Sequence, residues 1–189
     1  MRIAALVLAA GASRRLGRPK QLVELRSEPL LRRSARIALE AGCDPVLPVL
    51  GFEAAAMERA LAGLAVRAIV NSRWMEGMSS SIRCGISSLP ADADAVLLVA
   101  CDQWALEAAD LGRLLEAFRA APSRMAAAAY GGGHGIPAVF PSSSFADLIA
   151  LKGDRGARYL LQPEVSLVEM PSARLDLDVP EDLESMQQQ

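Results

Sequence analysis

The sequence predicts an α/β fold in which a mostly parallel sheet carries helices on both faces. The opening run Ile3–Ala9 is almost entirely apolar, the pattern of a strand covered on both sides. Further short apolar runs follow, and segments with helical spacing of apolar residues separate them. Strands that alternate with helices favour a parallel sheet, in which ligands bind beyond the carboxyl ends of the strands.

Each expected element follows from its apolar spacing and from the residues that bound it. Ser27 is a candidate cap for the first helix, and Gly42 is a candidate end for it. The expected strands are Ile3–Ala9, Val46–Leu50, 66–70, Ala95–Ala100, 125–130, 137–140 and 165–170. The expected helices are 29–40, 53–61, 79–88, 109–120, 145–151, 156–161 and 180–186.

Length and composition bound the class of protein. The 189 residues fit one domain over positions 1–189, and the 52% of hydrophobic residues argue against disorder. A net charge of −2 argues against a nucleic-acid partner. Three scattered cysteines indicate reduced thiols and a cytoplasmic protein. No apolar run is long enough to indicate a membrane partner, and the opening run reads as a buried strand, not as a signal peptide.

The loop after the first strand is the first candidate site. Arg14, Arg15, Arg18 and Lys20 place four positive charges within a few residues of Gly11. Glycine allows close approach of the backbone to a ligand, and successive amides of such a turn can cradle phosphate. The spacing matches neither the dinucleotide-binding fingerprint nor the P-loop. A solvated basic turn is the alternative interpretation.

Two further loops carry polar side chains. Asn71 and three serines, Ser79 to Ser81, flank the start of an expected helix, where they can bind an anion or simply cap the helix. Asp102 follows the buried strand Ala95–Ala100, and a carboxylate placed there suits Mg²⁺, which prefers one or two carboxylates plus phosphate oxygens. The alternative is a solvated or helix-capping aspartate.

The first loop resembles a family signature. Its pattern, Leu-Ala-Ala-Gly-x-Ser-x-Arg-x-Gly-x-x-Lys, is similar to that of nucleotidyltransferases that include the molybdenum cofactor cytidylyltransferases and guanylyltransferases. The resemblance implies a three-layer α/β/α, Rossmann-like fold of the nucleotide-diphospho-sugar transferase type. It also implies that Arg15 and Lys20 are catalytic and that the loop wraps a nucleoside triphosphate through Leu8, Ala9, Ala10, Gly11, Ala12, Ser13 and Lys20.

Later segments resemble the same family in the same order. Asn-x-x-Trp-x-x-Gly-Met-x-Ser-Ser implies that Asn71, Ser79 and Ser81 hold the nucleotide, and Asp102 matches the metal-binding aspartate. Trp104 stands where the family usually has proline. Gly-x-Pro-x-x-Phe and Gly-Asp-x-Gly-Ala-Arg imply an acceptor side. Near the end, Asp176 and Asp178 share one side of an extended segment, and Asp178 is favoured as the second metal ligand. The implied acceptor residues are Gly135, Pro137, Asp154 and Arg158.

The resemblance implies a Mg²⁺-dependent transfer of CMP from CTP to a phosphorylated acceptor, molybdopterin, with release of pyrophosphate. Ala10 and the serine turn favour CTP, and a GTP-using guanylyltransferase is the alternative. A non-catalytic carrier that delivers the cofactor to a client molybdoenzyme is a second alternative. A nicotinamide-dependent oxidoreductase is disfavoured by the glycine spacing. His134 is the only histidine, so no histidine metal site is expected.

Overall fold

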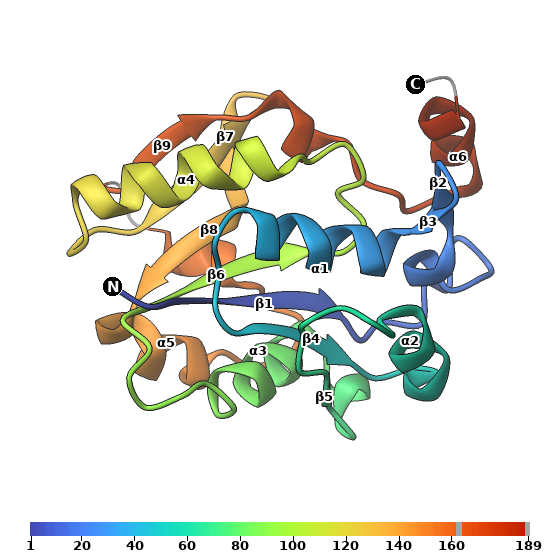
Figure 1. Ribbon diagram of the computed structural model, residues 1–189, viewed down its shortest axis with the longest axis horizontal. Coiled ribbons are helices and arrows are strands. Elements are labelled where there is room, and N and C mark those ends of the chain that lie inside the picture. Colours follow the sequence, from blue (N-terminus) through green and yellow to red (C-terminus); the bar gives the residue numbers. More distant parts are fainter. Residues whose placement is uncertain (162–163, 188–189) are drawn as a thin grey trace.

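The computed structural model describes residues 1–161 and 164–187. A seven-stranded sheet in the order β5-β4-β1-β6-β8-β7-β9 forms the centre of the molecule (Figure 1). Its neighbouring strands pair in parallel except at β8, which runs antiparallel to both β6 and β7. The strands are β1 Ile3–Ala9, β4 Val46–Leu50, β5 Ile69–Val70, β6 Ala95–Ala100, β7 Ala126–Tyr130, β8 Gly133–Pro141 and β9 Ser166–Glu169.

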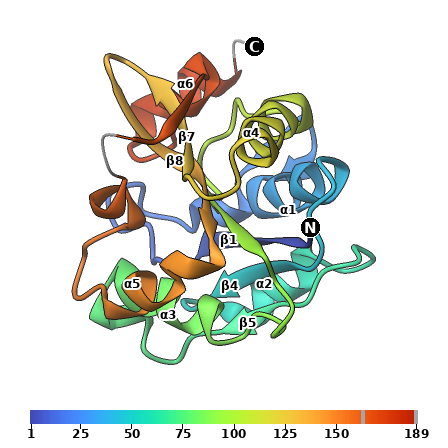
Figure 2. The ribbon, with the colours of Figure 1, turned by 90° about the vertical axis from the view of Figure 1, so that its left-hand side faces the viewer.

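Helices cover both faces of this sheet, as Figures 1 and 2 show. On one face lie α1 (Leu30–Glu40) and α4 (Ala108–Ala120), and on the other lie α3 (Met78–Ile86) and α5 (Phe145–Ala150). The remaining helices are α2 (Ala54–Ala60) and α6 (Pro180–Gln187). Short 3-10 turns complete the chain: η1 Lys20–Leu22, η2 Trp74–Glu76, η3 Ser142–Ser144, η4 Ala157–Leu160 and η5 Pro171–Arg174.

Two hydrophobic cores lie on the two faces of the sheet. Alternate residues of β1 point to opposite faces, so Ala5 and Val7 join the core under α1 and α4, whereas Leu6 joins the core under α3 and α5. Burial on both faces explains why β1 is apolar throughout. The expected mostly parallel three-layer arrangement is confirmed.

Most expected elements are present, and their ends differ by a few residues. The exact bounds expected for Ile3–Ala9, Val46–Leu50 and Ala95–Ala100 are found. The expected strand 66–70 is shorter, because only Ile69–Val70 pairs with β4 at the sheet edge. The expected strand 137–140 is longer: it begins at Gly133, after a turn in which Gly131 and Gly132 both have positive φ. Such angles suit glycine in a two-residue hairpin turn.

One hairpin was not expected, and it changes how the first helix begins. Strands β2 (Glu24–Leu25) and β3 (Glu28–Pro29) pair through a turn at Arg26 and Ser27, both with positive φ. Ser27 is therefore a turn residue and not the helix cap, and α1 begins after Pro29 without a side-chain cap. Arg-Ser lacks the Asn-Gly or Asp-Gly signal of such turns, so the sequence gives little indication of it.

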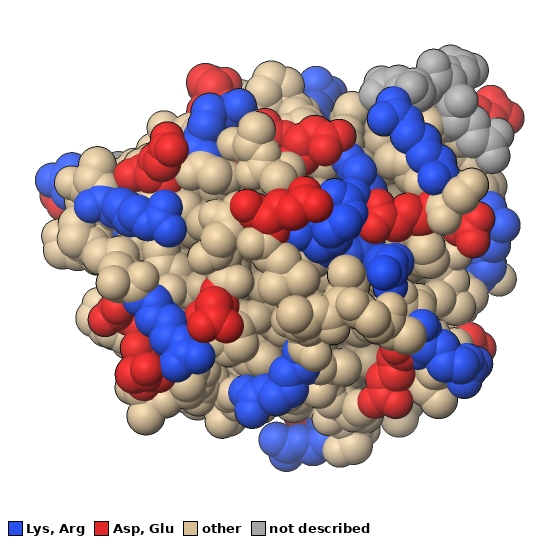
Figure 3. Space-filling model, in the orientation of Figure 1, with Lys and Arg blue, Asp and Glu red and all other residues tan. Residues whose placement is uncertain are grey.

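The parallel strands point their carboxyl ends toward one side of the molecule. In Figure 1 the arrows of β1, β4 and β6 all end on the right, where β2, β3 and α6 also lie. On the face drawn in Figure 3, basic and acidic side chains are interspersed, without a broad patch of one sign. Within the described residues, no helix has the length and apolar character needed to cross a bilayer. Because ligands bind beyond the carboxyl ends of parallel strands, the direction of these strands indicates a site at the loops after β1, β5 and β6.

Candidate active site

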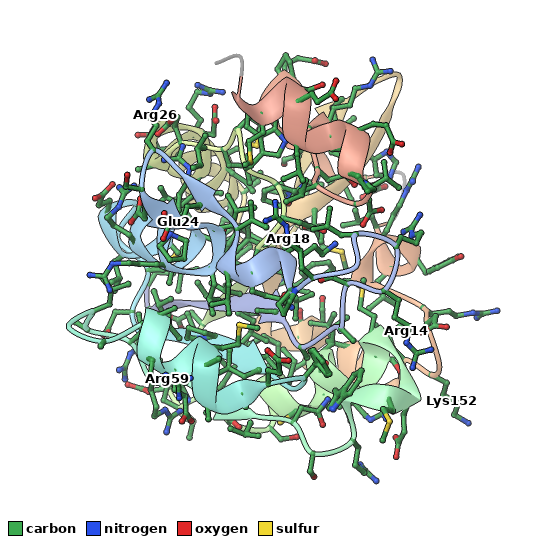
Figure 4. All side chains as sticks on the ribbon, turned by 90° about the vertical axis from the view of Figure 1, so that its right-hand side faces the viewer. Arg14, Arg18, Glu24, Arg26, Arg59 and Lys152 are labelled. Atoms are coloured by element: carbon green, nitrogen blue, oxygen red, sulfur yellow. The ribbon has the colours of Figure 1, made fainter. Side chains whose placement is uncertain are left out.

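A cleft of about 430 Å³ opens at the carboxyl ends of β1 and β6. Its walls come from the loop after β1, the turn before α3, the loop after β6 and the loop after α5. Figure 4 looks onto this end of the molecule, with Arg14 and Arg18 of the first loop labelled. The lining residues are Leu8, Ala9, Ala10, Gly11, Arg14, Lys20, Gln21, Trp74, Met75, Gly77, Met78, Ser81, Ala100, Cys101, Asp102 and Asp154.

The first loop is held in shape by Gln21. This side chain is 1% exposed, and its Nε2 donates to the carbonyl oxygens of Ala9 at 2.9 Å and Gly11 at 2.7 Å. Ser13 completes the tie, because its hydroxyl accepts from the Lys20 amide at 3.2 Å and donates to Gln21 Oε1 at 3.4 Å. The loop thus folds back on itself, and its shape depends on a buried amide that satisfies two carbonyl groups.

Gly11 presents its backbone to the cleft. A Cβ on this residue would meet no atom within 4 Å, so it would project into open space. Among the described residues, the amide groups of Gly11, Ala12 and Arg14 have no hydrogen-bond partner in the protein. These groups are available to an anion such as a phosphate.

Four charged side chains form a cluster beside the cleft. The Lys20 ammonium donates to Asp102 Oδ2 and to Asp178 Oδ1, the latter at 3.0 Å. Arg15 Nη2 donates to Asp178 Oδ2 at 2.7 Å. The side chains of Lys20 and Asp102 are only 18% and 14% exposed, whereas that of Arg15 is 72% exposed. Residues far apart in the sequence thus converge on one small region.

The charges in this cluster stabilise one another. Burial by itself lowers the pKa of Lys20, but Asp102 and Asp178 outweigh it and raise that pKa overall, so Lys20 stays protonated. Burial also works to raise the pKa of Asp178, but Lys20 and Arg15 outweigh it, and the pKa lies below the usual value. Lys20 and Asp178 therefore both carry their charges at neutral pH.

Asp176 connects this cluster with the acceptor side expected from the sequence. Partial burial and repulsion by Asp102 and Asp178 raise its pKa. Burial raises the pKa of Tyr130 too, with Arg158 opposing the shift and Asp176 adding to it. The Tyr130 hydroxyl donates to the Ile136 carbonyl at 3.3 Å. Tyr130 therefore lies within electrostatic reach of both Asp176 and Arg158.

The turn before α3 is organised by Asn71, which is 5% exposed. Its Nδ2 donates to Ser80 Oγ at 2.8 Å and to Ser81 Oγ at 3.1 Å, and its Oδ1 accepts from the Arg73 amide at 3.0 Å. Asn71 lines a separate small cavity and not the main cleft. Its contacts are those of a residue that holds the serine turn, while Ser81 itself faces the cleft.

The loop after α5 packs tightly on this turn. A Cβ on Gly77, whose φ is +103°, would come within 2.6 Å of the Gly153 carbonyl oxygen. The Ser79 amide donates to that same oxygen at 3.1 Å. Glycine is required here both by its positive φ and by the close approach of the two backbones. The contact brings Asp154 into the cleft wall.

The family follows from comparison with known proteins. The sequence profile of the family described as the MobA-like NTP transferase domain matches residues 5–170. The chain belongs to this family.

Relatives of this NTP transferase domain carry different names. The nicotine blue oxidoreductase of Paenarthrobacter nicotinovorans is 32% identical, over 98% of this chain and 94% of the relative. A probable molybdenum cofactor guanylyltransferase of Opitutus terrae is 34% identical, over 62% of this chain and 56% of the relative. The family resemblance expected from the sequence is confirmed, whereas the choice of CTP is not.

Solved structures share the whole fold. The crystal structure of Rv0371c from Mycobacterium tuberculosis has a TM-score of 0.86 at 28% identity, and covers 100% of this chain and 99% of that one. Its complex with manganese has a TM-score of 0.79 at 27% identity, with the same coverage of 100% and 99%. A nucleotidyl transferase from Methanothermobacter, 23% identical, has a TM-score of 0.83 over 99% of this chain and 96% of that one. The expected Rossmann-like nucleotidyltransferase fold is confirmed.

The structure places some of the expected site residues of this domain in the cleft wall and others beside it. Leu8, Ala9, Ala10, Gly11, Lys20, Ser81, Asp102 and Asp154 line the cleft. The other expected residues lie outside its lining: Ala12, Ser13, Arg15, Asn71, Ser79, Asp178, Gly135, Pro137 and Arg158. Arg15 and Asp178 join the charged cluster, while Gly135 lies beside Tyr130 and Arg158. Pro137 is buried in β8. The roles of these residues stay predictions.

Sequence reasoning did not single out Gln21, and it gave no individual role to Arg14, which counted only among the positive charges of the loop, or to Trp74, which stood only within a motif. Arg14 lines the cleft, whereas the neighbouring Arg15 turns to Asp178. Trp74 stacks edge-on against Phe52, with ring centroids 5.8 Å apart. Gln21 carries no periodic signal, and only the adjacent Lys20 marked its position.

We predict that Gln21→Glu lowers the free energy of unfolding by about 1–3 kcal/mol, because a carboxylate would face two carbonyl oxygens that now receive N–H donors. Urea denaturation at pH 7 measures the change. Exposed Glu24, on the adjacent hairpin, provides the control Glu24→Gln, which is expected to shift stability by less than about 0.5 kcal/mol. Equal stability of Gln21→Glu and wild type would contradict the anchoring role.

Proposed function

We propose that this MobA-like domain transfers CMP from CTP to the phosphate of a molybdopterin-type acceptor, with Mg²⁺ bound, and releases pyrophosphate. The observation that carries the proposal is the convergence of Asp102 and Asp178 on the Lys20 ammonium, next to a cleft bounded by a glycine loop. A nucleoside triphosphate needs both cations for its phosphates and carboxylates for its metal, and this site supplies them together.

The donor set fits a divalent cation. Two carboxylate oxygens already converge on one cation, the Lys20 ammonium. Within residues 1–161 and 164–187, no three His, Cys, Asp or Glu side chains are grouped to hold a metal by themselves. Mg²⁺ commonly uses one or two carboxylates and completes its shell with phosphate oxygens and water. Asp102 and Asp178 would hold the ion, which supplies charge neutralisation at the phosphate oxygens when bound.

The nucleophile needs little activation by the protein. A phosphate monoester has its second pKa near 6, so it is largely a dianion at neutral pH. Attack of its oxygen on the α-phosphorus forms one P–O bond, and the bond from the α-phosphorus to the bridging oxygen breaks as pyrophosphate leaves. No proton transfer to a general base is required, and His134 is the chain's only histidine.

The protein contributes position and charge. The amides around Gly11 would hold the triphosphate in line, and Gln21 would keep them in place. Lys20 would exchange its carboxylate partners for phosphate oxygens and offset the charge that develops on the leaving group. Arg14, which lines the cleft, would add a second positive charge. Tyr130 and Arg158, which lie beside Gly135, would contact the acceptor.

Two specific observations favour alternatives. The relative from Opitutus terrae is named a guanylyltransferase, so GTP is the competing donor. The relative that matches nearly the whole chain is named an oxidoreductase, so hydride transfer from a nicotinamide cofactor is the competing chemistry. A carrier that binds molybdopterin for a client molybdoenzyme would occupy the cleft without releasing pyrophosphate.

We expect pyrophosphate release from CTP, in the presence of Mg²⁺ and molybdopterin, to exceed release from GTP at least tenfold. A coupled pyrophosphate assay with each nucleotide measures the difference, and chelation by EDTA is expected to stop the reaction. Release from GTP alone would reassign the donor. Oxidation of NADH or NADPH without pyrophosphate release would replace the proposal by the oxidoreductase function, and molybdopterin binding without either reaction would support the carrier.

The charged cluster gives a second test. We predict that Lys20→Ala lowers kcat/KM about a hundredfold or more, the usual scale for loss of one preorganised electrostatic contact. Asp102→Ala is predicted to abolish Mg²⁺-dependent turnover. Steady-state kinetics measure both, with Lys152→Ala and Asp147→Ala as controls, because these side chains are exposed and lie outside the cleft. Wild-type rates for Lys20→Ala and Asp102→Ala would exclude this site.

A further inference from the structure

A third, smaller hydrophobic core lies apart from the two that cover the sheet. It joins the first loop, the β2–β3 hairpin, the start of α1, the loop after β6 and the C-terminal segment. Trp104 contributes its aromatic ring and is 4% exposed. The buried members are Leu16, Val23, Leu30, Trp104, Leu177 and Met186, with Leu25, Ala105 and Leu183 packed against them.

Three of the six buried members of this core lie one or two residues from a charged residue of the cluster. Leu16 directly follows Arg15, and Leu177 directly precedes Asp178. Trp104 is two residues beyond Asp102. Side chains one or two positions apart share the same stretch of backbone. The packing of Leu16, Trp104 and Leu177 therefore restricts the positions of the neighbouring charged side chains.

Hydrogen bonds tie the same segments together. The Asp102 carbonyl accepts from the Trp104 amide at 2.9 Å and from the Leu177 amide at 3.1 Å. Arg33 of α1 donates from Nε to the Trp104 carbonyl at 3.2 Å and from Nη2 to the Leu106 carbonyl at 2.9 Å. The backbone around Trp104 is thus fixed to the C-terminal segment on one side and to α1 on the other.

We propose that Trp104 is a positioning residue, which packs the first loop against the C-terminal segment and thereby holds Lys20, Asp102 and Asp178 in register for the triphosphate and its metal. Trp104 is not among the residues that line the main cleft, so it would act through its neighbours. A proline at this position would lack both the amide that donates to Asp102 and the ring that fills the core. In its place, tryptophan supplies a large rigid surface that bridges two segments. This role rests on the proposed nucleotidyl transfer for its kinetic consequences only.

The test compares Trp104→Ala and Trp104→Phe with Phe118→Ala. Phe118 is 1% exposed in the core under α4, so its truncation matches the loss of a buried aromatic ring without touching the third core. Hydrogen exchange is measured by mass spectrometry over residues 13–20, 175–179 and 46–50, and the Mg²⁺ concentration for half-maximal turnover is measured with CTP. Trp104→Leu replaces Trp104→Ala if the latter does not fold.

We expect Trp104→Ala to speed exchange at least tenfold over residues 13–20 and 175–179, without change over 46–50, and to raise the half-saturating Mg²⁺ concentration at least fivefold. Trp104→Phe is expected to bring the exchange rates and the half-saturating Mg²⁺ concentration most of the way back to wild-type values. Phe118→Ala is expected to lower the melting temperature and to leave the exchange rates over residues 13–20 and 175–179 and the Mg²⁺ concentration unchanged. Unchanged exchange in Trp104→Ala, or equal effects in Phe118→Ala, overturns the proposal. If the wild type releases no pyrophosphate, the proposed function fails, and the exchange data alone decide the role of Trp104.

Discussion

The arrangement of the site depends on an attraction between a half-buried ammonium and two carboxylates. Lys20 comes from the loop after β1, Asp102 from the end of β6, and Asp178 from the segment after β9, so one contact joins three distant parts of the chain. Opposite charges favour each other's charged forms: the carboxylates raise the pKa of Lys20, and Lys20 with Arg15 lowers the pKa of Asp178. The fold places these groups together because its parallel strands end at one edge.

The sequence predicted those features that depend on the buried strands and on the edge formed by their carboxyl ends. Apolar runs such as Ile3–Ala9 define buried strands with little ambiguity, and the strand-end rule locates Lys20 and Asp102 on one side of the sheet. The hairpin at Arg26 and Ser27 was missed because its turn residues are not those that usually adopt positive φ. The anchoring role of Gln21 was missed because it depends on how the loop folds back, which is a long-range property of packing.

Some predicted site residues line the cleft and others lie beside it, because the two groups have different tasks. Gly11 and Ser81 face the cleft, whereas Ser13 and Asn71 form hydrogen bonds with the backbone and side chains that shape it. A motif therefore marks both the groups that can touch a ligand and the groups that hold them. Relatives named for different activities are similar to this chain in sequence, in line with the rule that one fold can support several chemistries.

The central claim is that Lys20 and the two carboxylates serve one metal–triphosphate complex. Crystals grown with Mn²⁺ and a non-hydrolysable CTP analogue test it most directly, because anomalous scattering locates the manganese. The account predicts an anomalous peak in contact with Asp102 and Asp178, with the Lys20 Nζ moved onto a phosphate oxygen. A triphosphate bound elsewhere, with Lys20 still paired to both carboxylates, would contradict it.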